Sequence, residues 1–210
     1  MIITKNDIIG KIRTAIDDIL PSATDSFTND TDAELWQAVW HAVQALLTEL
    51  PLAMLSPSSL LPLNNNTPPY IVTNTNGSGC IVLPENFLRF VSLQLSHWHR
   101  PVTELIEPGS EEALSQTSKW GRGTPEKPRA MLDYNEDGKQ VLRYWTAGKT
   151  NNLYVHTVTV LNHIPTATHT STQITCALKN EAEPIVVYRA AAIFFEGKKE
   201  PETAEKFRNL

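Results

Sequence analysis

The chain has 210 residues, of which 41% are hydrophobic and 20% are charged, so it can bury a core as one domain or one domain with a large insertion. With 18 basic and 23 acidic residues the net charge is −5, which argues against a broad basic surface for nucleic acid. Two cysteines, Cys80 and Cys176, are too few and too far apart for a disulfide scaffold or a zinc site.

Two amphipathic helices are predicted in the first fifty residues. A stripe of isoleucines at helical spacing begins after Thr4, which resembles a capping box together with Asp7, and it stops at Pro21. A second helix with a wider apolar face ends at Pro51. Residues 1–52 are therefore expected to form a helical hairpin.

Residues 53–78 differ in composition from the helices before them. They contain several prolines and the run Asn64-Asn65-Asn66, which predict a long surface loop with short extended or helical pieces. Such a loop can be functional or a disordered tip, and the composition leaves both open.

From residue 79 to residue 183 the hydrophobic pattern changes to that of a β-rich insertion. Asp137-Gly138 is a hairpin signal between two of its strands. The predicted strands are 80–83, 87–95, 129–134, 140–145 and 152–161, with further short extended pieces at 166–172 and 173–178.

The last segment, 184–210, returns to helical periodicity. Pro184 suits the start of a helix, Gly197 its end, and Pro201 the start of a final short helix through Phe207. The fold class is therefore α+β: a helical base of two N-terminal helices and a C-terminal helix, with an inserted antiparallel β-sandwich or barrel.

No catalytic motif is recognisable in the sequence, so we expect neither an enzyme nor a bound cofactor or metal. On a strand, His97 and His99 would share one face and could bind a metal with a third ligand from His156, His163 or His169. A half-exposed strand end with Trp98 packed inward explains the same residues and is the favoured interpretation. No leader peptide or membrane-length apolar run is visible, which predicts a protein made in the cytoplasm with no membrane partner.

The most basic stretch is predicted to be an inter-subunit or DNA-contact loop. One aromatic residue, Trp120, lies among four cations. Because the chain as a whole has a net negative charge, contact of this loop with protein is favoured over contact with DNA. The cations are Lys119, Arg122, Lys127 and Arg129.

Four short motifs resemble the head-to-tail connector (adaptor) proteins of tailed bacteriophages, which lie beneath the portal. The most specific is the strand entry Leu-Pro-x-Asp/Asn-Phe-Leu-Arg, matched here by Leu83 to Arg89. The others are Asp32–Trp36 with the helix that follows, Trp98–Val102 and Arg122–Pro125.

The resemblance implies a ring of twelve copies in the virion, at the interface between head and tail. The helical part would line or surround the DNA channel, and the β-rich part would face outward or toward the tail. Partners would be copies of the chain, the portal, tail or further adaptor proteins, and transiently the DNA. Lateral contacts are expected from Trp120, Tyr134 and Tyr144.

The polar C-terminal tail would reach the portal and gain order by binding it. Its docking residues would be Lys198, Lys199, Phe207, Arg208 and Leu210. On this hypothesis, removing 198–210 leaves the fold intact and abolishes docking. Two alternatives remain open: a small metal-assisted enzyme that uses His97 and His99, and a β-sandwich adhesion module.

Overall fold

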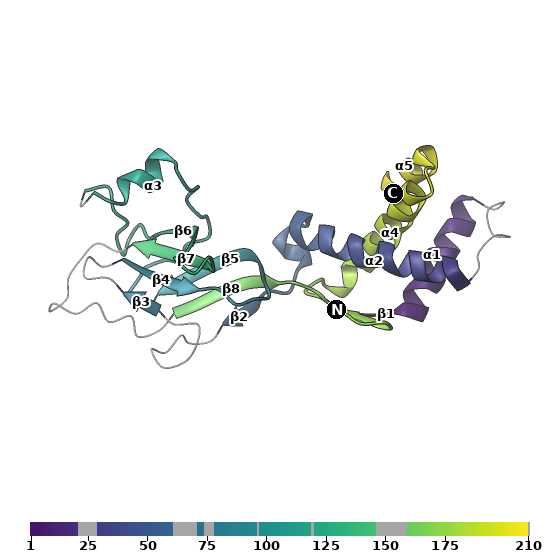
Figure 1. The fold of residues 1–210 in the computed structure, drawn as a ribbon, viewed down its shortest axis with the longest axis horizontal. Coiled ribbons are helices and arrows are strands. Elements are labelled where there is room, and N and C mark those ends of the chain that lie inside the picture. Colours follow the sequence, from purple (N-terminus) through teal and green to yellow (C-terminus); the bar gives the residue numbers. More distant parts are fainter. Residues whose placement is uncertain are drawn as a thin grey trace. The chain divides into compact units, whose positions relative to one another are not determined.

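The computed structural model divides the chain into two compact units (Figure 1). The helical unit comprises Met1–Ser56 and Ile164–Leu210, and the β-rich unit comprises Pro57–His163. The residues that the structure describes are 1–20, 29–60, 71–73, 78–95, 97–118, 120–145 and 159–209.

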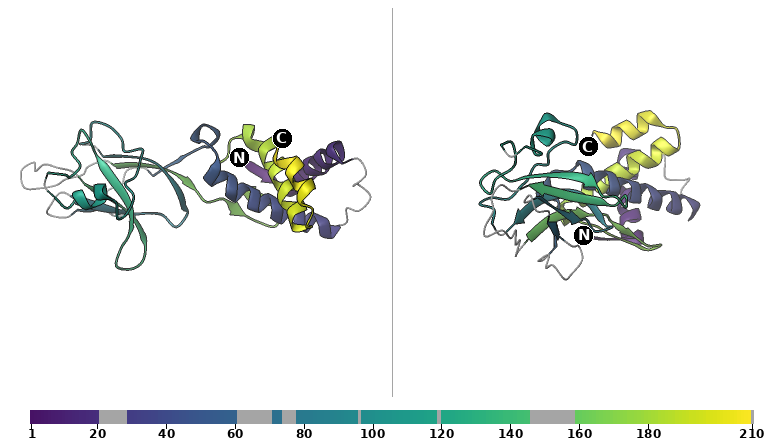
Figure 2. Two further views of the ribbon diagram at one scale, coloured as in Figure 1. Left: turned by 90° about the horizontal axis from the view of Figure 1, so that it is seen from above. Right: turned by 60° about the vertical axis from the view of Figure 1, so that its left-hand side comes forward.

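The helical unit is built from both ends of the described chain. Its α-helices are α1 (Lys5–Ile19), α2 (Asn29–Glu49), α4 (Glu183–Gly197) and α5 (Pro201–Arg208). A short 3-10 turn, η2 (Leu52–Met54), follows α2, and another, η3 (Asn180–Ala182), precedes α4. Helix α4 packs against α1, α2 and α5, and α5 lies beside it in Figure 2. Both N-terminal helices and both C-terminal helices are thus confirmed.

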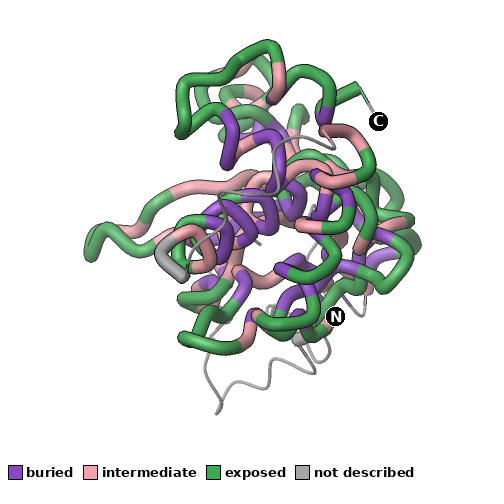
Figure 3. Tube along the Cα trace, turned by 90° about the vertical axis from the view of Figure 1, so that its right-hand side faces the viewer, coloured by how far each residue is buried: buried purple, intermediate pink, exposed green. Residues whose placement is uncertain are grey.

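The predicted apolar stripes explain this packing. Ile8, Ile12 and Ile16 of α1 are fully buried, and the small side chains of Ala190–Ala192 let neighbouring helices approach α4 closely. Buried segments lie on the inner sides of the helices, with exposed ones outside (Figure 3).

A strand at the start of the chain was not predicted, whereas the two strands beside it fall within the extended pieces predicted at 166–172 and 173–178. Strand β1 (Ile2–Thr4) pairs antiparallel with β10 (Gln173–Thr175), which pairs with β9 (Thr168–His169). The Met1 amino group also donates to the carbonyl oxygens of Cys176 at 2.8 Å and Leu178 at 3.0 Å. The predicted capping box is wrong, because Thr4 ends β1 and its side chain makes no cap hydrogen bond.

Two further antiparallel sheets lie in the β-rich unit. One has the order β3-β4-β7-β6 and the other β2-β8-β5. Strands predicted at 87–95, 129–134 and 140–145 are confirmed, as is the hairpin at Gly138, whose positive φ of 74° suits glycine. The strands are β2 (Ser58–Leu60), β3 (Ile71–Thr73), β4 (Ser78–Val82), β5 (Phe87–Leu95), β6 (Arg129–Tyr134), β7 (Gln140–Trp145) and β8 (Thr159–Pro165).

One apolar cluster joins these two sheets. Leu93 and Leu95 of β5, Leu142 and Tyr144 of β7, and other buried residues make up its centre. Trp98 packs inward, as expected, with its ring edge-on to Tyr144 at a centroid distance of 6.0 Å. The short helix α3 (Glu111–Ser115) lies in the excursion between β5 and β6.

The mixed α+β class is confirmed, with strands in three small antiparallel sheets. The pairings among the described residues do not close a single barrel, and they do not establish one sandwich. Strands β9 and β10 belong to the helical unit, whereas the sequence pattern placed them with the β-rich insertion of 79–183. None of the described helices is both long and apolar enough to cross a bilayer.

Candidate interaction surfaces

The predicted docking tail is folded onto the helical unit. Phe207 is only 1% exposed and stacks on Phe195 at a centroid distance of 5.5 Å and an interplanar angle of 12°. The expectation of a tail that waits for a partner to order it is therefore wrong for Phe207. Folding α5 back on α4 brings two aromatic rings together, which buries apolar surface without any partner.

The charged tail residues are exposed at the surface, but two of them are paired. Lys198 forms an ion pair with Glu34 of α2, and Arg208 forms one with Glu196 of α4. Lys199 has a positive φ of 63° at the turn between α4 and α5. Leu210 lies outside the described residues.

The predicted contact loop is held in shape by Gln116. This side chain is 1% exposed; its amide nitrogen donates to the carbonyl oxygens of Glu112 at 3.0 Å and Gly121 at 3.1 Å. Its amide oxygen accepts from the backbone N–H of Gly123 at 2.8 Å. Because these bonds tie Gln116 to Gly121 and Gly123, they hold these described residues of the loop together without any partner.

Tight backbone packing adds to this constraint. A Cβ at Gly121 would lie 2.6 Å from the carbonyl oxygen of Ser115, and a Cβ at Gly123 would lie 3.0 Å from the carbonyl oxygen of Trp145. Both positions therefore require glycine for close approach. The loop sequence suggested a turn, but not that one buried amide organises it.

Trp120 is 92% exposed in this loop, and Leu114 of α3 is 66% exposed nearby in the sequence. Arg129 forms an ion pair with Glu112 at 2.7 Å, and the Arg122 Nε donates to the Gln116 carbonyl oxygen at 3.3 Å. Lys127 is exposed in a turn with Thr124. Lys119 lies outside the described residues.

One expected lateral-contact residue is misassigned. Tyr144 is fully buried in the core of the β-rich unit, and burial raises its pKa. It cannot touch a neighbouring copy without unfolding its own unit. Tyr134, at the end of β6, is 65% exposed and stays a candidate.

Among the described residues, the histidines do not form the metal site that the metal-assisted alternative needs. Strand β5 ends at Leu95, so His97 and His99 lie in a turn and do not share a strand face. His99 lies 3.9 Å from Glu126, and burial lowers the pKa of His97. Within the described ranges, no group of three or more His, Cys, Asp or Glu side chains could hold a metal.

The remaining candidate ligands are dispersed. His163 is buried in the β-rich unit, stacked on Phe87, and His169 is stacked on Trp40 in the helical unit. His156 lies outside the described residues.

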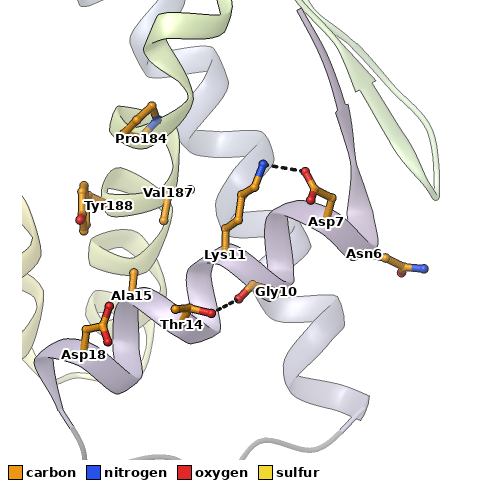
Figure 4. Close-up of a pocket in the computed structure, with 10 residues that line it drawn as sticks. All are labelled: Asn6, Asp7, Gly10, Lys11, Thr14, Ala15, Asp18, Pro184, Val187 and Tyr188. Carbon is orange, nitrogen blue, oxygen red and sulfur yellow. Dashed lines mark hydrogen bonds and ion pairs between the residues drawn. The ribbon is translucent and has the colours of Figure 1, made fainter.

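An open groove that was not predicted lies between α1 and α4 and has a volume of about 550 Å³ (Figure 4). Gly10 leaves its centre open, since a Cβ there would meet nothing within 4 Å. Val187 and Tyr188 of α4 supply apolar surface. The sequence does contain a signal for this groove, because Gly10 lies inside a predicted helix. Glycine there makes the helix less stable than alanine would, so its presence indicates a position where a side chain is unfavourable for packing or function.

Charged groups line the rim of this groove. Lys11 bonds to Asp7 at 2.9 Å and to Glu183 at 2.7 Å, and these bonds raise its pKa. Asp18 lies at the other end and makes no hydrogen bond or ion pair with another described residue (Figure 4). The rim therefore carries an excess of negative charge.

The scan against protein-family models found no match, and the search of curated proteins found none either.

Proposed function

We propose that this chain is a structural subunit of the head-to-tail connector of a tailed phage, which forms a ring between portal and tail through which DNA passes. It is not an enzyme in this proposal, and its location is the virion. The main support is the division into a helical unit built from both ends of the described chain and a β-rich unit inserted between them. This is the element order that the resemblance implies.

The motif of the resemblance has a physical role in the β-rich unit. Leu83 to Phe87 form the tight connection between β4 and β5, where the Phe87 N–H donates to the Pro84 carbonyl oxygen at 2.9 Å. The motif thus carries the chain from one sheet of the β-rich unit to the other, so its support for the function comes only through the shared pattern.

Charge and surface chemistry agree with a passive channel wall. A net charge of −5 suits a surface past which DNA must slide without being retained. Portal docking is assigned to the exposed face of α5 with Lys199 and Arg208, because Phe207 is buried inside the unit.

The proposal is tested by mixing the full chain with the portal protein of the same phage and imaging the product by electron microscopy. A closed ring of this chain seated on the portal, with an open axial channel, is expected. The proposal would be refuted if the chain did not associate with the portal ring at any ratio or concentration tried.

A further inference from the structure

We propose that the loop carrying Trp120 docks into the α1–α4 groove of a second copy of this chain. The inference rests on the proposed ring in one respect only, namely that copies meet side by side. The contact joins two different surfaces, a projecting loop and a groove, so it is heterologous and can propagate around a ring.

The loop has the properties of an interface anchor. An indole that is 92% exposed is unusual on a protein surface, and tryptophan is among the residues most enriched at energetic hot spots. The Gln116 hydrogen bonds fix the backbone around it. Because these bonds already restrain Gly121 and Gly123 beside Trp120, less backbone entropy is lost when the indole is buried.

The groove has the matching shape. Its volume of about 550 Å³ lies in the range of sites that enclose a ring-sized group. The missing side chain at Gly10 opens its floor, and Val187 and Tyr188 offer apolar contact for an aromatic ring.

The charges around the two surfaces are complementary. Arg122 and Lys127 follow Trp120 in the same loop, against one carboxylate, Glu126. The groove carries Asp18, which has no partner among the described residues, and the Asp7 carboxylate, which shares Lys11 with Glu183. Opposite excess charge would steer the loop to the groove and fix its orientation.

Two substitutions separate docking from folding. Trp120→Ala removes an exposed side chain, and Gly10→Leu fills the groove where the chain itself has open space. Leucine is also a better helix former than glycine, so this variant should be at least as stable as the parent. The matched controls are Tyr134→Ala, another exposed aromatic, and Gly197→Leu, another glycine with open space around it.

The experiment measures the mass distribution of the full chain against concentration by analytical ultracentrifugation, with urea unfolding of each variant as a check on folding. The parent and both controls should associate. Trp120→Ala and Gly10→Leu should each weaken association at least about thirtyfold, the loss of a hot-spot residue. Neither should lower the unfolding midpoint measured at a concentration at which the parent is monomeric, where association adds no stability.

Mixing the two variants gives the decisive result. The intact loop of the Gly10→Leu chain fits the intact groove of the Trp120→Ala chain, so an equimolar mixture should form dimers and nothing larger. A mixture that stays monomeric, a parent that stays monomeric, or either variant associating like the parent would overturn the contact.

These outcomes are independent of the proposed function. Rings on the portal that form equally well from Trp120→Ala chains would overturn this contact and leave the connector proposal standing. Dimers in the mixture without any portal ring would support this contact and overturn the connector proposal.

Discussion

Removing the Phe207 ring tests whether the C-terminal helix is part of the fold. The side chain is 1% exposed and stacks on Phe195 at 5.5 Å. Truncating a buried phenylalanine to alanine costs about 3–5 kcal/mol, including the cavity that remains. Since native proteins are stable by about 5–15 kcal/mol, Phe207→Ala should remove about a fifth or more of the stability of a typical domain.

The assay is unfolding in guanidinium chloride followed by far-ultraviolet circular dichroism, which reports the helices. Glu205→Ala, an exposed position in the same helix, is the control and should change the free energy of unfolding by no more than about 0.5 kcal/mol. A Phe207→Ala cost below about 1 kcal/mol would refute the packing of α5 on α4.

The same reasoning changes the expected result of deleting residues 198–210. The deletion removes the buried Ala204 and Phe207 and uncovers Phe195. A loss of portal docking in such a truncation would therefore mix a folding defect with a lost contact. Substitutions on the exposed face of α5, such as Arg208→Ala, are the cleaner test of docking.

Three further predictions concern substitutions at single residues. Burial lowers the pKa of His163 below its usual 6.5, with a smaller opposing effect from the Ser58 backbone. Near this pH the unfolded chain therefore binds more protons than the folded chain. The contribution of His163 to stability is fully present above pH 6.5 and falls as the pH decreases below it. His163→Phe should reduce that loss between pH 7 and pH 5 in urea unfolding. Gln116→Leu should cost about 1–3 kcal/mol by leaving the Gly123 N–H unpaired, and should speed hydrogen exchange in residues 116–123. Gly10→Ala should stabilise the chain by about 0.5–1 kcal/mol, measured by chemical denaturation.

Each of these has an outcome that contradicts it. An unchanged pH profile in His163→Phe would show that other groups cause the acid sensitivity. Protected amides in Gln116→Leu would mean that the loop has another support. Gly121→Ala is the opposite control for Gly10→Ala, because its Cβ would lie 2.6 Å from a backbone oxygen, and a stabilised Gly121→Ala would contradict the loop geometry.

Local patterns predicted most of the elements. The isoleucine spacing of α1, the alternation in β5 and the Asp137-Gly138 turn each act over a few residues, and the structure confirms all three. These features are decided by backbone geometry and by which face is apolar, so the sequence alone determined them.

Contacts between distant residues were decided only by the tertiary structure. Ile3 pairs with Ile174, and Met1 bonds to Leu178, although more than 170 residues separate them in the chain. No local pattern encodes which short strand will find which partner, since the pairing depends on where the helices between them bring the chain. The same holds for Tyr144, whose alternation pattern fits either face of a strand until the second sheet covers it.

The same distinction between sequence and tertiary structure holds for the candidate surfaces. The sequence by itself determined that the stretch around Trp120 is basic with one aromatic, and that Gly10 lies within a stretch of helical periodicity. Only the folded chain decided that Gln116 is buried beneath that loop, that Gly10 opens a groove toward α4, and that Phe207 is already covered. Burial is a property of what packs above a residue, and residues far away in the sequence supply that cover.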